Sequence, residues 1–203
     1  MGRTNVPKGE ARREAILRAA LALIGERGPD AVTHRALAER AGVSLSATTY
    51  WFESKEAILQ EAFLLAAREE VERVERVVLD LAPRELDLSE WATAVAAALA
   101  ADLEDAPTRH IAFIELVLEG TRRPWLREEV ARWETAYLQL AELGLRATGS
   151  PEPVMDARLV VGAITGLMLG QLANPQPDFE AAVFRPALER LFTGLVEPQA
   201  VPT

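Results

Sequence analysis

The chain has 203 residues, of which 49% are hydrophobic and 26% are charged, and its formal net charge is −9. These values are ordinary for a soluble globular protein, and the hydrophobic fraction is too high for a disordered chain. Because the sequence contains no cysteine, it cannot form a disulfide, a thiolate nucleophile or a cysteine-ligated metal site. It has only two histidines, His34 and His110, so we expect no metal site and no histidine-based catalytic triad.

The charge is unevenly distributed along the chain. Residues 1–55 hold nine Lys and Arg against six Asp and Glu, a balance of +3. Residues 56–203 hold thirteen against twenty-five, a balance of −12. This asymmetry suggests a segment that faces phosphates, attached to an acidic body, with chance variation in composition as the alternative.

Two features bear on cellular location. The first thirty residues lack the apolar core of a signal peptide. The longest uncharged stretch, from Leu159 to Pro177, has fewer consecutive apolar residues than the roughly 20 that a membrane-spanning helix needs. We therefore expect a soluble, cytoplasmic protein with no membrane partner.

The hydrophobic residues recur at helical spacing through almost the whole sequence. A first apolar stripe covers positions 16–24, and Gly28 marks the end of that helix. Thr33, Ser44 and Ser54 each precede a helical pattern. They are good N-caps, since a hydroxyl oxygen can accept a hydrogen bond from an unpaired N–H of the first turn.

The remaining helices are separated by glycine and proline. The pattern that follows Ser54 continues to about Leu81, and no strand pattern or internal repeat is present. Later helices are predicted over residues 87–105, 108–119, 125–147, 154–173 and 178–196. The sequence thus predicts an all-α protein of about nine helices, with a three-helix N-terminal headpiece and a C-terminal helical domain.

Residues 10–53 contain three predicted helices in a very small unit. The second and third are joined through Ala41-Gly42-Val43, a tight turn in which glycine can adopt a positive φ. Two short helices that cross at such a turn form a helix-turn-helix, whose second helix enters the DNA major groove. From geometry alone, an ordinary corner between two bundle helices is the alternative.

This unit resembles the DNA-binding domain of the TetR (tetracycline repressor-like) family. The resemblance covers residues 12–60 and rests on T-H-R-A-L-A-E-R-A-G-V-S from Thr33, followed by F-E-S-K-E from Phe52. It implies a DNA-binding domain over residues 1–53, with a disordered arm over residues 1–8. It also implies an effector-binding and dimerisation domain over residues 54–203.

The resemblance assigns roles to individual positions. It makes Thr33 the cap of the second helix, Arg35 a residue that reaches a phosphate or a guanine edge, and Lys55 a phosphate-binding residue. The third helix departs from the family pattern, and we expect Tyr50 or Trp51 to replace its phosphate-binding tyrosine. The expected DNA-binding residues are Thr33, His34, Arg35, Ser44, Leu45, Ser46, Ala47, Thr49, Tyr50, Trp51 and Lys55.

The predicted recognition helix, residues 45–50, contains no Arg, Lys, Asn or Gln, the side chains that make bidentate contacts to bases. Direct readout would therefore rest on hydroxyl groups and on apolar contacts to thymine methyl groups, supported by Arg35. Affinity would come mostly from phosphates, through Arg35, Lys55 and the arm residues Arg3 and Lys8.

Small residues recur on one face of the predicted helix over residues 154–173, where they would let another helix approach closely. In the family that the chain resembles, the last two helices usually form a four-helix bundle between subunits. Core packing within one chain is the alternative. The expected dimer-interface residues are Leu159, Gly162, Gly166, Gly170, Phe184, Leu188, Leu191 and Phe192.

Aromatic residues and one carboxylate suggest a small-molecule site in the C-terminal domain. Glu115 lies in a helix that is apolar on nearly all sides, so it needs either a salt-bridge partner in the core or a polar group of a ligand. The expected ligand-binding residues are Trp91, Phe113, Glu115, Trp133, Tyr137 and Met168. For each of them, plain core packing is the alternative.

The sequence therefore predicts a transcriptional repressor that binds double-stranded operator DNA as a homodimer and is released by a small, largely apolar effector. A ligand-independent DNA-binding regulator of the same fold is the alternative. The sequence has no phosphate-binding loop and no H-E-x-x-H motif, so we expect neither enzyme activity nor a cofactor.

Overall fold

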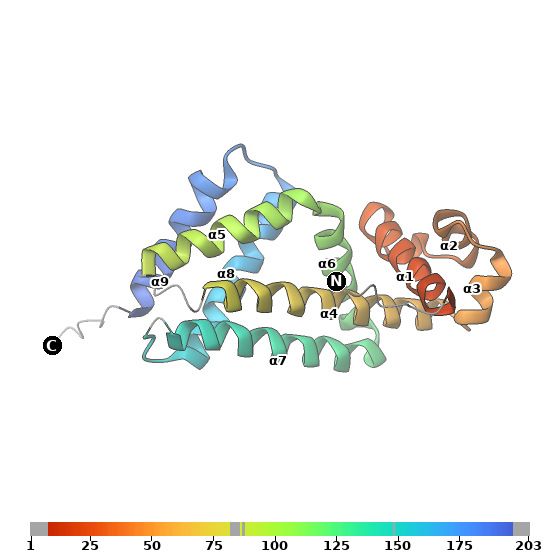
Figure 1. Cartoon of the computed structure of the whole chain (residues 1–203), viewed down its shortest axis with the longest axis horizontal. Coiled ribbons are helices and arrows are strands. Elements are labelled where there is room, and N and C mark those ends of the chain that lie inside the picture. Colours follow the sequence, from red (N-terminus) through yellow and green to blue (C-terminus); the bar gives the residue numbers. More distant parts are fainter. Residues whose placement is uncertain (1–7, 82–85, 87, 148, 197–203) are drawn as a thin grey trace. The chain divides into compact units, whose positions relative to one another are not determined.

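The computed structural model describes residues 8–81, 86, 88–147 and 149–196. Within these ranges the chain forms nine α-helices and no strand, as the sequence predicts (Figure 1). The helices divide into two compact units, residues 1–69 with 108–131 and residues 70–107 with 132–203. The predicted arm lies outside the described residues except for Lys8, where α1 begins.

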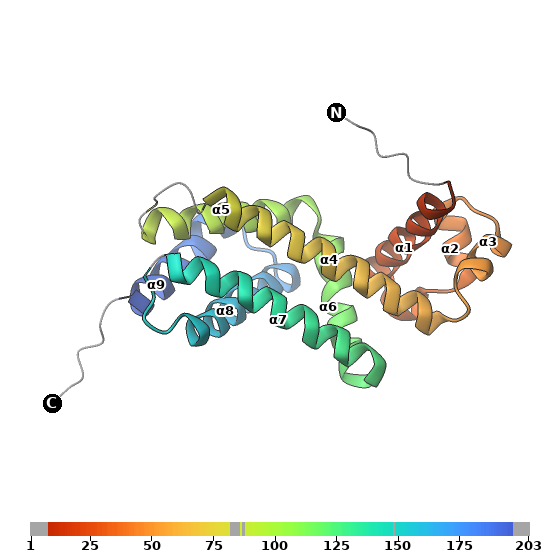
Figure 2. The same ribbon diagram turned by 60° about the horizontal axis from the view of Figure 1, so that its bottom comes forward.

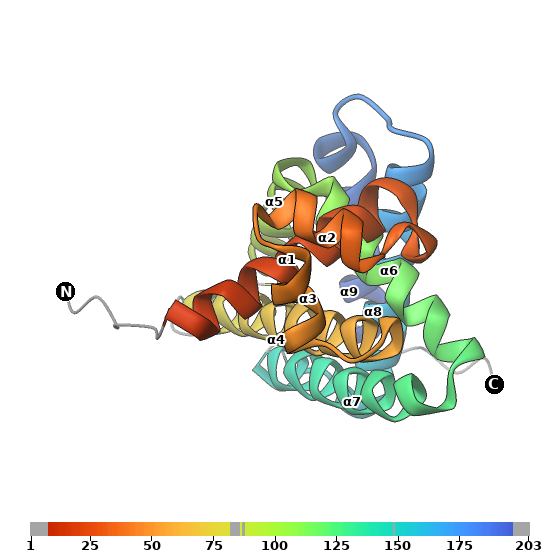
Figure 3. The same ribbon diagram turned by 90° about the vertical axis from the view of Figure 1, so that its right-hand side faces the viewer.

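The first unit consists of the N-terminal helices, the first part of α4, and α6. Its elements are α1 (Lys8–Arg27), the 3-10 turn η1 (Pro29–Ala31), α2 (His34–Ala41), α3 (Leu45–Trp51), α4 (Lys55–Leu81), α6 (Pro107–Arg122) and the start of α7 (Pro124–Ala147). Helices α2 and α3 lie next to each other across a tight turn (Figure 3).

Hydroxyl side chains fix the starts of three helices in this unit. Thr33, Ser44 and Ser54 each accept a hydrogen bond from the backbone N–H three residues later, at 3.1–3.2 Å. Helix α2 ends at Gly42, whose φ of 64° lies in the left-handed region that glycine adopts without steric cost. The predicted caps and the predicted turn are confirmed.

One very close helix contact joins α1 to α6. A Cβ atom added at Gly25 would overlap with the backbone carbonyl oxygen of Thr108, in the first turn of α6. Only glycine lets these two backbones approach so closely. The contact explains why α6 belongs to the first unit, and the sequence analysis did not identify it.

The second unit consists of the remainder of α4 and α7 together with α5 (Leu88–Asp105), α8 (Pro153–Ala173), the π-helical turn η3 (Glu180–Phe184) and α9 (Arg185–Val196). Helix α5 packs extensively against α9. The later part of α4 runs beside α7 in both views (Figures 1 and 2). The largest side chains of its apolar core include Leu145, Phe184, Leu188 and Phe192.

This core corrects part of the predicted dimer interface. Phe184, Leu188 and Phe192 are fully buried within the single chain, where the ring of Phe192 meets that of Trp91 edge to face at 5.3 Å. The prediction that these three side chains form a subunit interface is therefore wrong. An amphipathic stripe has the same spacing whether it packs on its own chain or on a second one.

Helix α8 is apolar, yet much of it is exposed in the single chain. Its most apolar window has a mean hydropathy of 1.4 and is only 22% buried. By length and hydropathy alone this helix could cross a membrane, whereas the sequence analysis judged the stretch too short because it counted from Leu159. Leu159 is 51% exposed, and a Cβ at Gly162, Gly166 or Gly170 would meet nothing within 4 Å.

Candidate functional site

Helix α3 presents an accessible face of the first unit. Leu45 and Tyr50 are 54% and 79% exposed. Ser46 and Thr49 are also exposed, and Ala47 is half-buried. The structure thus brings the predicted recognition-helix residues together on one helix.

The aromatic residue Trp51 anchors α3 on α1. Its half-buried indole ring lies 3.4 Å from the position that a Cβ on Gly9 would occupy. The ring of Tyr50 meets that of Trp51 edge to face, with centroids 5.2 Å apart. Of the two aromatic residues expected to replace the family tyrosine, Tyr50 is therefore the accessible one.

A buried threonine holds α3 against α2. The hydroxyl of Thr48 donates a hydrogen bond to the carbonyl oxygen of Leu45 at 2.8 Å, and it lies 3.3 Å from Nδ1 of His34. One ring nitrogen of His34, an expected DNA-binding residue, is therefore engaged at the contact between the two helices. This role of Thr48 was not predicted from the sequence.

Two cationic side chains flank the recognition helix in the sequence. Arg35 is exposed on α2, in the turn that Thr33 caps. Lys55 begins α4, where its Nζ atom lies 3.1 Å from a carboxylate oxygen of Asp30, whose side chain is fully exposed. A phosphate that reaches Lys55 would therefore compete with Asp30 for the ammonium group.

An arginine ties the start of α4 to the end of α6. Nε of Arg123 donates a hydrogen bond to Glu119 at 2.6 Å, and its Nη1 lies 3.4 Å from Glu56. The hydrogen bond from Arg123 lowers the pKa of the Glu119 carboxyl. Glu115, expected to be the buried carboxylate of this helix, is only half-buried, and Glu119 holds that place instead.

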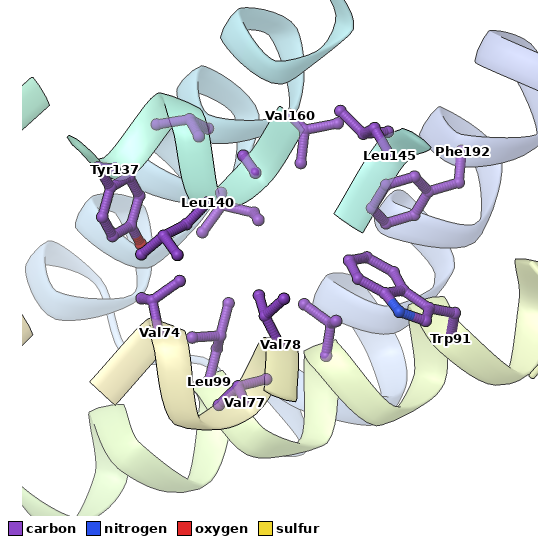
Figure 4. A pocket seen from close by; sticks show the side chains of 14 residues that line it. Val74, Val77, Val78, Trp91, Leu99, Tyr137, Leu140, Leu145, Val160 and Phe192 are labelled. Carbon is purple, nitrogen blue, oxygen red and sulfur yellow. The ribbon is translucent and has the colours of Figure 1, made fainter. Parts of the chain in front are cut away.

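The second unit contains a cavity of about 50 Å³ (Figure 4). Tyr137 lies at one end of it, while Trp91 and Phe192 lie at the other. None of its described lining residues carries a charge. The lining residues are Val74, Val77, Val78, Trp91, Val95, Leu99, Tyr137, Leu140, Ala141, Leu145, Val160, Val161, Ile164 and Phe192.

Two of the expected ligand-binding residues, Trp91 and Tyr137, line this cavity. Trp133 contacts the ring of Tyr137 at 5.3 Å, and Met168 packs against the core without reaching the lining. Phe113 stacks on Phe63 in the first unit, to which Glu115 also belongs, so neither Phe113 nor Glu115 lines the cavity. The sequence analysis missed the three valines of α4.

Among the described residues that line the cavity, only Tyr137 carries a hydroxyl group. Its burial raises the pKa of this group far above the ordinary value, so the phenol is neutral at physiological pH. A cluster of charges, in which Arg73 pairs with Glu70 and Asp102, acts on Tyr137 from outside the lining. The cavity therefore offers a largely apolar surface, with the two lining residues that bear polar groups, Tyr137 and Trp91, at opposite ends.

A headpiece with an exposed short helix after a glycine turn, together with nearby cations, defines a helix-turn-helix DNA-binding protein. Residues 16–62 match the model of the bacterial regulatory proteins of the tetR family. Residues 86–197, more than half of the chain, match the tetracyclin repressor-like C-terminal domain. The chain belongs to the TetR family of transcriptional regulators, which are soluble DNA-binding proteins rather than enzymes.

Individual relatives agree with this assignment. An uncharacterized HTH-type transcriptional regulator of Bacillus subtilis (strain 168), YdeS, is 43% identical over 61 residues, which span 30% of this chain and only 31% of YdeS. The multidrug binding protein EbrR, complexed with imidazole, has 26% identity and a TM-score of 0.67 over 97% of both chains. A putative regulator of Streptomyces coelicolor A3(2), SCO7518, has 32% identity and a TM-score of 0.67 over 90% of this chain and 98% of its own.

Proposed function

We propose that the chain is a ligand-responsive repressor, which binds operator DNA as a homodimer and is released by a small, largely apolar effector. The observation that carries this proposal is the apolar cavity, because α4 lines it and also bears Lys55 at its first position. Residues 1–53 would bind DNA, and residues 54–203 would bind the effector and form the dimer. A ligand-independent regulator of the same fold is the second candidate.

The small size of the cavity supports a coupling between effector binding and helix movement. Small-molecule sites usually measure about 300–1,000 Å³, whereas this cavity measures about 50 Å³. An effector therefore has to separate the helices that line the cavity, including the stretch of α4 that carries Val74 and Val78. Since α4 is continuous from Lys55 to Leu81, a displacement of that stretch would be carried to the start of the helix.

The lining also restricts the effector chemically. An ion placed among apolar side chains without a charged partner loses its hydration without compensation. We therefore expect a neutral molecule with a large apolar surface and at most one or two polar groups, which would face Tyr137 or Trp91. EbrR is complexed with ethidium, malachite green or proflavin in solved structures. These three molecules are aromatic cations, so the effector proposed here shares their apolar rings but not their charge.

The exposed face of α8 supports the homodimer. Leu159 and the three glycines of this helix form an apolar surface on which a second helix could pack closely, and such a surface is unfavourable in water. Leu191 of α9 is half-buried and remains a candidate for the same interface. Phe184, Leu188 and Phe192 are left out, because the core of the chain already buries them.

The test begins with DNA fragments that the purified chain retains from a random-sequence library. Neutral apolar molecules are then screened for those that raise the melting temperature of the chain and release the selected duplex.

The variant Ala141→Val fills part of the cavity, so it should bind the duplex but lose the response. Ala147→Val, at the exposed end of the same helix, should keep it. If every stabilising molecule leaves DNA binding unchanged, the ligand-independent regulator is the correct description.

A further inference from the structure

Apart from the exposed phenol of Tyr50, the hydroxyl groups at the start and middle of α3 are engaged within the headpiece. Thr48 donates its hydroxyl hydrogen to the carbonyl of Leu45 at 2.8 Å, and Thr49 lies within hydrogen-bond distance of the carbonyl of Ser46 at 3.2 Å. The hydroxyls of Ser44 and Ser46 lie 3.0 Å apart, and Ser44 also accepts a hydrogen bond from the N–H of Ala47. Each hydroxyl has only one hydrogen to donate.

This arrangement weakens hydrogen bonding as the means of direct readout. Guanine and adenine present acceptors in the major groove, and thymine presents its O4 acceptor, so a reader of these atoms needs free donors. Thr48 and Thr49 direct their donors at their own helix. Of the two modes of readout that the sequence analysis left open, apolar contact therefore gains support.

The exposed apolar group of α3 is Leu45. Its side chain is 54% exposed and belongs to the first turn of the helix, on the same face as Thr49 four residues later. The one apolar group that a standard base pair presents in the major groove is the C5-methyl of thymine. Contact between this methyl and Leu45 removes apolar surface of both from water, whereas the polar edge of any other base would lose hydration there.

We propose that α3 selects its operator chiefly through thymine methyl groups and that Leu45 is the principal specificity-determining residue. The inference rests on the proposed operator binding and names the chemical group that is read. Arg35 and Lys55 then supply phosphate contacts, which strengthen binding to all sequences alike.

The experiment removes single methyl groups from the DNA. A duplex selected by the full-length chain from a random-sequence library is resynthesised with one thymine at a time replaced by deoxyuridine, which keeps the base pair and lacks the methyl. At one or two positions in each half-site, we expect the dissociation constant to rise about three- to tenfold. Binding is measured by fluorescence anisotropy at fixed salt.

Protein variants then assign the contact. Leu45→Ala should bind the thymine and deoxyuridine duplexes equally at one of the sensitive positions, while Leu45→Met should keep a difference between them. Lys55→Ala should weaken binding to both duplexes by the same factor, because it removes a phosphate contact. Because Leu45 is largely exposed, its replacement should leave the fold intact, and a melting curve checks this.

Three outcomes would overturn the inference. If no deoxyuridine substitution changes the affinity, or if Leu45→Ala keeps the full sensitivity, the methyl groups are not read by Leu45 although the operator binding stands. If 7-deazaguanine substitutions weaken binding in a manner that depends on Arg35 while deoxyuridine has no effect, guanine readout replaces the proposal. If the selection enriches no duplex, the operator binding itself fails.

Discussion

Both compact units have a buried apolar core and ion pairs between helices, but they differ in what the core encloses. In the first, hydroxyl caps fix the helix starts, and ion pairs join α1 to α4 through Arg13 with Glu61 and Arg18 with Glu69. In the second, a large apolar core surrounds a cavity that has no charged lining. The contrast suits a reading helix whose start is fixed by a cap and an effector site that opens around a guest.

The largest loss of stability is expected when an aromatic side chain is removed from the second unit. Phe192→Ala should reduce the free energy of unfolding by about 3–5 kcal/mol, because it deletes a fully buried ring and enlarges the cavity. Val183→Ala, at an exposed position of η3, should change it by less than about 0.5 kcal/mol. Urea unfolding measures both, and equal losses would contradict the role assigned to the core.

In the first unit, the corresponding test is the contact between the backbones of α1 and α6. Gly25→Ala should cost about 1–3 kcal/mol, since the new methyl group would overlap with the carbonyl oxygen of Thr108 and force the two backbones apart. Gly194→Ala, in α9 with nothing within 4 Å of the added carbon, should be neutral or slightly stabilising. Thermal melting distinguishes the two, and an unchanged Gly25→Ala variant would show that this approach is not tight.

A smaller loss of stability is expected when the threonine that holds the recognition helix against α2 is replaced. Thr48→Val keeps the shape of the side chain but removes its buried hydrogen bonds, so it should cost about 1 kcal/mol. Thr193→Val removes an equivalent bond to a helix carbonyl at an exposed position, where water can replace it. Its cost should be smaller, and the difference between the two variants measures what burial adds.

The smallest change in stability is expected from the ion pair of Lys55. Asp30→Asn should alter the free energy of unfolding by less than about 1 kcal/mol, because the pair is exposed to water. It should nonetheless strengthen DNA binding at low salt, since it removes a competitor for the lysine. Glu26→Gln removes the same charge from an exposed pair with Arg40 and should strengthen binding less. Equal gains would indicate an effect of net charge alone.

The sequence predicts the first unit well where the signals are local. The roles of Thr33, Ser44 and Ser54 as caps, and of Gly42 in the turn, are confirmed because each depends on residues within one helical turn. The contact between Gly25 and Thr108 was not predicted, since it joins segments more than 80 residues apart and leaves no periodic trace in either.

In the second unit, the sequence predicted some residues of the cavity and missed others. Trp91 and Tyr137 were predicted because aromatic residues are conspicuous, but Val74, Val77 and Val78 look like any core valines until five helices are assembled around them. Phe184 and Phe192 were misassigned for a related reason, because spacing shows that a stripe is buried without showing what buries it.

The small volume of the cavity has a consequence for the sensitivity of the proposed regulator. If an effector binds only the fraction of molecules in which the helices have separated, its apparent dissociation constant equals the intrinsic value divided by that fraction. Substitutions that loosen the packing around Trp91 and Phe192 would raise the fraction, so a less stable variant would respond to a lower dose. Variants that are released from DNA at a lower effector concentration would therefore also have a lower melting temperature.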